Sequence, residues 1–101
     1  MDLGLSGRTA LVTGASSGLG LATARALAVE GVRVALVSRS AEKLATAVAT
    51  VNGDPLTVTA DLSDGTSIDA MLTEVTEALG HVDILVANAG GPPPGGFAST
   101  D

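Results

Sequence analysis

A glycine-rich turn near the start of the chain constrains the fold more than any other segment. Residues 13–20 have the sequence TGASSGLG; an apolar run, residues 10–12, precedes them, and good helix formers follow at residues 21–28. The segment is therefore predicted to be a strand, a turn and a helix. Glycines let the backbone turn tightly and bring its N–H groups close to a ligand. Because a helix N-terminus attracts anions, we expect this turn to bind a phosphate or pyrophosphate.

The strand–helix alternation continues along the chain. Strands are predicted at residues 8–13, 32–37, 55–60 and 82–87. The helices between them are expected to run to about residue 30, from a Ser40 cap to residues 52–53, and from a Ser63 or Asp64 cap to Gly80, with a glycine ending each one. Helix positions 68, 71, 72, 75 and 79 form an apolar stripe that is expected to face the sheet.

This βαβαβαβ pattern predicts an α/β fold of the Rossmann type, a doubly wound parallel sheet with strand order 3-2-1-4. In such a sheet, ligands bind beyond the carboxyl ends of the strands, where the order reverses between the first and fourth strands. Without further chain, the fourth strand is expected to be an unpaired apolar edge that is prone to association.

Composition excludes several classes of function. The 101 residues are enough for one domain, and 46% of them are hydrophobic. The chain has no cysteine and a single histidine, so no disulfide or metal site is expected. The formal net charge is −6 and the five basic residues form no patch, which argues against a nucleic-acid partner. No apolar run approaches the length of a membrane span, so we expect a cytoplasmic protein with no membrane partner.

The residues after the second strand indicate which cofactor the turn would hold. A carboxylate about 20 residues past a glycine turn binds the ribose hydroxyls of NAD. This chain has Ser38 and Arg39 there. A guanidinium binds a 2′-phosphate that an acid would repel, so the pair favours NADP over NAD, with Lys43 as a candidate helper. The alternative interpretation is an exposed arginine without a function.

Two motifs in order resemble the short-chain dehydrogenase/reductase (SDR) family. The glycine spacing T-G-x-x-x-G-x-G differs from the usual dinucleotide fingerprint G-x-G-x-x-G, and Asn88-Ala89-Gly90 follows the fourth strand. The resemblance implies that residues 1–101 are the N-terminal portion of an NADP-dependent oxidoreductase. Its reaction would interconvert a carbonyl and a secondary alcohol on a small-molecule substrate, and the full-length protein would form a homo-oligomer.

The resemblance also assigns roles to residues at the strand ends. An acid at the position of Asp61 contacts the adenine amino group in the family, and its neighbour Leu62 lines the adenine pocket; helix capping is the alternative for Asp61. The Asn88 amide can bridge neighbouring strand ends. His81 is expected to be a surface residue at the opposite end of the sheet. The predicted cofactor-binding residues are Gly14, Ser16, Ser17, Gly18, Leu19, Gly20, Ser38, Arg39, Asp61, Leu62, Asn88, Ala89 and Gly90.

The family's catalytic Tyr-x-x-x-Lys pair and its preceding serine have no counterpart here. The chain contains no tyrosine and its only lysine is Lys43, so no catalytic residue is assigned. Residues 97–101 look like the approach to a further helix. We therefore expect a truncated enzyme that is inactive by itself, and the Gly-Pro-Pro-Pro-Gly run resembles 3-oxoacyl carrier-protein reductase-like variants. The alternative is a non-catalytic NADP(H)-binding or regulatory module.

Overall fold

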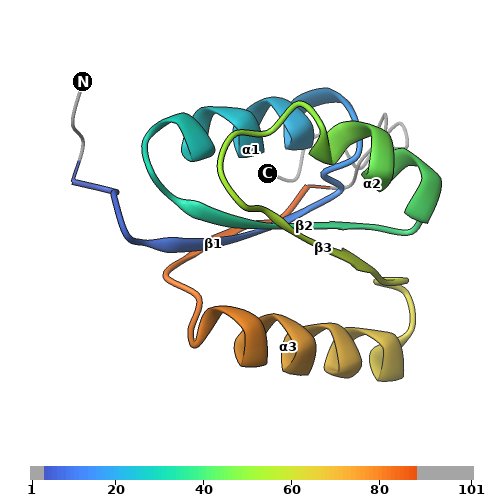
Figure 1. Cartoon of the computed structure of the whole chain (residues 1–101). Coiled ribbons are helices and arrows are strands. Elements are labelled where there is room, and N and C mark those ends of the chain that lie inside the picture. Colours follow the sequence, from blue (N-terminus) through green and yellow to red (C-terminus); the bar gives the residue numbers. More distant parts are fainter. Residues whose placement is uncertain (1–3, 89–101) are drawn as a thin grey trace, which may run out of the picture.

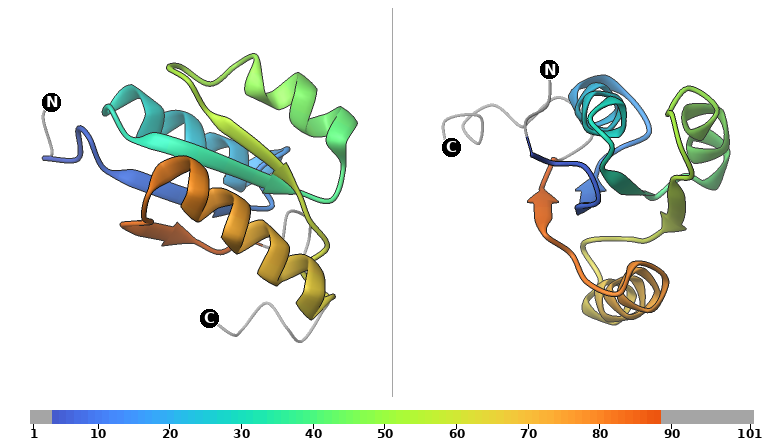
Figure 2. Two further views of the ribbon diagram at one scale, coloured as in Figure 1. Left: turned by 60° about the horizontal axis from the view of Figure 1, so that its bottom comes forward. Right: turned by 60° about the vertical axis from the view of Figure 1, so that its left-hand side comes forward.

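The structure, a computed structural model, describes residues 4–88. Within this part of the chain, four parallel strands form one sheet in the order β3-β2-β1-β4, which confirms the predicted order (Figure 1). The elements are β1 (Thr9–Thr13), α1 (Gly18–Val29), β2 (Arg33–Ser38), α2 (Ala41–Val48), β3 (Leu56–Thr59), α3 (Gly65–Leu79) and β4 (Ile84–Val86). Helices α1 and α2 cover one face of the sheet and α3 covers the other (Figures 1 and 2). The predicted helix approach at residues 97–101 lies outside the described residues.

The core has two apolar layers because successive strand residues point to opposite faces of the sheet. On the face of α1 and α2, Ala10 and Val12 of β1 pack in one cluster with residues of both helices. On the face of α3, Leu11 of β1 packs in a second cluster with Met71 and Val75. All of β1 is buried, which explains why its sequence is apolar at nearly every position rather than alternating.

Two of the three predicted helix ends are confirmed. Gly31 follows α1 and Gly80 ends α3, with φ of 88° and 86° respectively. The predicted end of α2 is wrong: the helix stops at Val48, well before Gly53. The Thr50 hydroxyl donates to the Ala47 carbonyl oxygen at 2.8 Å, and such side-chain bonds offer the backbone an alternative to further helix.

Strand β4 and helix α3 differ from the elements that the apolar pattern of the sequence predicts. Strand β4 has three residues and pairs, in the described structure, with β1 alone. Leu85 of β4 is 66% exposed, and association through this edge stays a prediction. The expectation that Leu72 faces the sheet is wrong, because α3 buries Met71 and Val75 and leaves Leu72, on the flank of that stripe, 43% exposed. Between residues 4 and 88, no helix is both long and apolar enough to span a membrane.

Candidate cofactor site

A cavity of about 340 Å³ lies beyond the carboxyl ends of the strands, at the edge of the sheet where the sequence predicts a ligand. The glycine-rich turn, the end of β2 with the start of α2, the segment after β3 and the second residue after β4 all contribute to it. Its lining residues are Gly14, Ser16, Ser17, Val37, Ser38, Arg39, Ser40, Lys43, Ala60, Asp61, Leu62, Ser63 and Asn88. The predicted site residues Gly18, Leu19 and Gly20 form the first turn of α1, directly after Ser17, and are not among the lining residues. The predicted site residues Ala89 and Gly90 lie outside the described residues.

The three glycines of the turn are required for two different reasons. Gly14 and Gly18 have φ of 59°, a left-handed conformation that favours glycine. Gly20 lies in the first turn of α1, where a Cβ atom would collide with the Gly14 carbonyl oxygen and lie 2.8 Å from Asn88 Nδ2. Gly20 therefore lets α1 approach the ends of β1 and β4 closely.

The first N–H groups of α1 donate no hydrogen bond to the side chain of its N-cap residue. Its N-cap residue, Ser17, makes no side-chain capping bond, and the first turn carries no acidic residue. By contrast, Ser40 caps α2 by accepting from Lys43 N–H, and Asp64 caps α3 by accepting from Thr66 N–H. The first amides of α1 therefore remain available to an anion at the positive end of the helix dipole.

Arg39 and Lys43 place two exposed cations at the cavity. In the described residues, the ion pairs are Arg33 with Asp54 and His81 with Asp83, so the Arg39 guanidinium has no salt-bridge partner there. A free guanidinium can bind a phosphate through two parallel hydrogen bonds.

Asp61 shapes the far wall of the cavity and does not cap α3. Its Oδ1 atom accepts from the Ser63 N–H at 3.0 Å and from the Ser63 hydroxyl at 2.7 Å. These bonds lower the pKa of Asp61, and the nearby charge of Arg39 lowers it further. Because Asp64 caps the helix, the capping alternative for Asp61 is wrong, although its carboxylate is used in the turn before α3.

A pair of residues that we call the carboxyl-end clasp, Thr13 and Asn88, joins β1 to β4 beside the cavity. Thr13 Oγ1 accepts from the Asn88 N–H at 2.9 Å and donates to the Asn88 carbonyl oxygen at 3.2 Å. Asn88 Nδ2 donates to the Gly14 carbonyl oxygen at 3.4 Å, so the side chain bridges strand ends as expected. The role of Thr13 was not predicted; its signal in the sequence is a polar residue at the end of an otherwise apolar strand.

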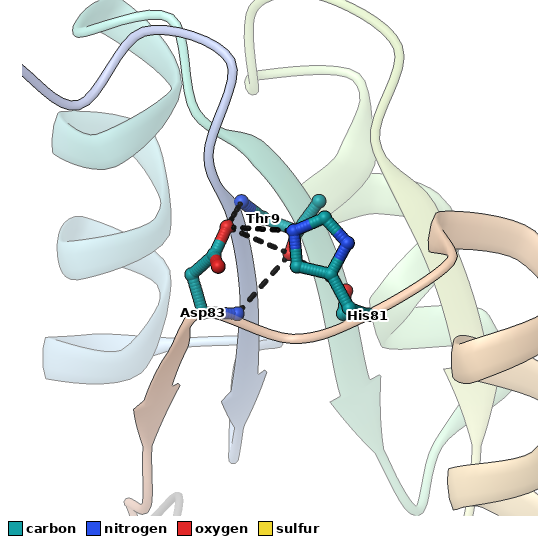
Figure 3. A network of polar contacts seen from close by, with 3 residues as sticks. All are labelled: Thr9, His81 and Asp83. Atoms are coloured by element: carbon teal, nitrogen blue, oxygen red, sulfur yellow. Dashed lines mark hydrogen bonds and ion pairs between the residues drawn. The ribbon is translucent and has the colours of Figure 1, made fainter.

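A second group, the amino-end clasp of Thr9, His81 and Asp83, joins the same two strands at the opposite end of the sheet (Figure 3). Asp83 Oδ2 accepts from the Thr9 N–H at 3.0 Å and lies 3.1 Å from His81 Nε2, while the Thr9 hydroxyl donates to the His81 carbonyl oxygen at 2.6 Å. The bond from the Thr9 backbone is the main reason that the pKa of Asp83 is lowered, and the His81 charge adds to it. His81 is thus at the end remote from the cavity, as predicted, and the role of Thr9 in joining the two strands was not predicted.

Comparisons with known proteins agree on one family. The family model of the short chain dehydrogenases matches residues 8–101. An uncharacterized oxidoreductase of Staphylococcus haemolyticus is 46% identical over 87 residues, covering 85% of this chain and 38% of that protein. Levodione reductase of Leifsonia aquatica is 42% identical over 88 residues, covering 82% of this chain and 33% of that protein.

Solved structures agree with the sequence comparisons. L-sorbose reductase of Gluconobacter frateurii, complexed with NADPH and L-sorbose, has a TM-score of 0.85 and 38% identity, covering 92% of this chain and 37% of that one. The chain therefore belongs to the short-chain dehydrogenase family of oxidoreductases, whose members bind a nicotinamide cofactor, and it has their Rossmann fold. It spans between 33% and 38% of the length of the two curated relatives named above.

Proposed function

We propose that this chain binds NADP(H) in the cavity beyond the carboxyl ends of the strands. The observation that carries the proposal is the guanidinium of Arg39, which has no ion-pair partner among residues 4–88. It lies on the same cavity as Ser17, the N-cap residue of α1, whose side chain makes no capping bond. NADP differs from NAD by a 2′-phosphate, so it presents anionic groups at two places, a pyrophosphate and this phosphate. The cavity offers positive potential at two corresponding places.

The chain's residues fit such a ligand in defined roles. The amides at residues 18–20 would hold the pyrophosphate, because no side chain of residues 4–88 caps them. Arg39, assisted by Lys43, would hold the 2′-phosphate. Asp61 and Leu62 would border the adenine ring on the other wall of the cavity.

The proposed preference for NADP over NAD depends on this chain's own residues, because the similar solved structures contain one cofactor or the other. One is L-sorbose reductase complexed with NADPH, and another is a xylitol dehydrogenase bound to NAD+. No acid stands at residues 38–39 of this chain to hold ribose hydroxyls. The chain thus has the residues that favour a 2′-phosphate and has no acid at residues 38–39, where one would repel it.

We assign the chain to the cofactor-binding part of an oxidoreductase that interconverts a carbonyl and a secondary alcohol. The bound nicotinamide would supply or accept the hydride, while the residues described here orient the cofactor. Relatives named as ketoacyl reductases, in Streptomyces virginiae and in Nostoc, support carbonyl reduction and are consistent with a 3-oxoacyl substrate. With no tyrosine among the 101 residues, we expect this chain by itself to bind cofactor without turnover.

Calorimetric titration of NADPH and NADH into wild type and Arg39→Ala tests the cofactor assignment. We expect wild type to prefer NADPH, and Arg39→Ala to weaken NADPH binding by about 10- to 100-fold with little effect on NADH, since hydrogen bonds to charged groups contribute about 1.5–3 kcal/mol. Arg33→Ala is the matched control, because Arg33 lies at the amino end of β2 in an exposed pair with Asp54. Equal affinities of wild type for the two cofactors would contradict the assignment.

A further inference from the structure

A chain of serine hydroxyl bonds joins the glycine-rich turn to the start of α2. Ser38 Oγ donates to Ser16 Oγ at 3.0 Å, and the Ser40 N–H donates to Ser38 Oγ at 3.2 Å. Ser40 Oγ in turn accepts from the Lys43 N–H at 3.2 Å. The two bonds of the Ser38 hydroxyl are part-buried, so water competes with them less than at the surface. The Ser38 hydroxyl thus contacts both Ser16 and the Ser40 N–H.

These bonds fix the backbone on both sides of Arg39. The Ser38 carbonyl oxygen accepts from the Ala60 N–H at 3.0 Å, which holds the end of β2 against the end of β3. Ser40 is held by the Ser38 hydroxyl on one side and serves as the N-cap of α2 on the other. Arg39 therefore projects from a short segment whose ends are both anchored, and one of those anchors is the glycine-rich turn itself.

We propose that Ser38 is a positioning residue for cofactor selectivity and acts through its bond to Ser16. The bond holds Arg39 at a set distance from the start of α1. The pyrophosphate of NADP can then bind at the start of α1 while its 2′-phosphate binds Arg39. This inference rests on the proposed function above. Without the bond, binding of the 2′-phosphate would first have to order the loop, and that ordering opposes binding.

A positioning role predicts non-additive effects in a double-mutant cycle. Ser38→Ala and Ser16→Ala each remove one half of the same bond. We expect each to lower the ratio of NADPH affinity to NADH affinity by about fivefold, as for loss of one neutral hydrogen bond. The double variant should lower the ratio no further than either single variant. Ser38→Thr keeps the hydroxyl and should have the same ratio of NADPH affinity to NADH affinity as wild type.

The titrations use NADPH and NADH on the purified protein, with circular dichroism to establish that each variant is folded. Thr46→Ala is the matched control, because the Thr46 hydroxyl donates to the Glu42 carbonyl oxygen within α2 and joins no other element. It should keep the wild-type ratio. If Ser38→Ala does not fold, the Ser16→Ala and Ser38→Thr variants still test the bond.

Several outcomes would overturn the inference. Additive losses in the double variant would mean that the two hydroxyls contact the ligand independently. An unchanged ratio in the folded single variants, or equal weakening of both cofactors, would mean that the bond has no part in selectivity. If wild type prefers NADPH and the serine variants keep that preference, this inference alone fails. If wild type does not prefer NADPH, the proposed function fails and the inference fails with it.

Discussion

Strands β1 and β4 are fastened at both ends by threonines of β1, but the two ends use different chemistry. The carboxyl-end clasp, Thr13 with Asn88, contains no ionisable group and lies beside the cavity. The amino-end clasp contains an acid and a histidine and lies at the far end of the sheet. The difference separates scaffold from site: variants at the amino end should change stability alone, whereas variants at the carboxyl end should change stability and cofactor binding.

The largest effect is expected from Gly20→Ala, at the carboxyl end. The added Cβ atom would collide with the Gly14 carbonyl oxygen and crowd Asn88, so we expect a loss of about 2–3 kcal/mol in the free energy of unfolding and weaker NADPH binding. Urea denaturation followed by circular dichroism measures the first effect, and calorimetry measures the second.

Gly65→Ala is the matched control for this variant. Gly65 begins α3 as Gly18 begins α1, and an added Cβ atom at Gly65 would have no neighbour within 4 Å. We expect this variant to be as stable as wild type or slightly more stable, because alanine loses less backbone entropy than glycine on folding. If Gly20→Ala were as stable as Gly65→Ala, the close approach of α1 to the strand ends would not be needed.

Next in size is the pair Thr13→Val and Thr9→Val. Each substitution keeps the branched shape and removes the hydroxyl of one clasp, which leaves backbone groups of Asn88 or of residues 81–83 without that partner. We expect each to lower the free energy of unfolding by about 1–2 kcal/mol. In calorimetric titrations only Thr13→Val should weaken NADPH binding. Similar losses of affinity in both variants would remove the distinction between the two ends.

The smallest effect is a difference in acid stability. Because the folded protein lowers the pKa of Asp83, mainly through the bond from the Thr9 backbone, this group stabilises the fold above the ordinary aspartate pKa. That contribution is lost as the pH falls through the lowered pKa. In urea denaturation at a series of pH values below about 4, Asp83→Asn should lose less stability than wild type.

The same titration sharpens the comparison of the two ends. Thr13→Val should show the same acid dependence as wild type, because its clasp has no ionisable group. A wild-type dependence in Asp83→Asn, or a changed one in Thr13→Val, would contradict the assignment of acid sensitivity to the amino end.

The sheet order and the edge that bears the cavity were predictable from sequence because they depend on local patterns. Short loops and strand–helix alternation leave few topologies, and residues 13–20 mark the first strand-to-helix turn. The end of α2 was not predictable from Gly53, since the helix stops at Val48, where both the N–H and the hydroxyl of Thr50 bond to the Ala47 carbonyl oxygen. Rules that place helix ends at glycines ignore such side-chain competition.

The contacts that set the details of the site join residues far apart in the chain, which is why the sequence pattern does not show them. The two clasps pair residues 72–75 positions apart. Gly20 looks like Gly18 in the sequence, yet only the folded chain brings Gly14 and Asn88 against it. Likewise, Ser16 and Ser38 were predicted as separate cofactor contacts, and the structure shows that they bond to each other.

Amide chemical-shift mapping by NMR tests the central claim most directly, because it reports on both ends of the sheet at once. On titration with NADPH, we expect large chemical-shift changes for the amides at residues 18–20 and for the Arg39 side chain. The amides of Thr9 and Asp83 should change only slightly. NADH should shift residues 18–20 and leave the Arg39 side chain largely unchanged. Shifts confined to the amino end, or an unperturbed first turn of α1 at saturating NADPH, would contradict the account.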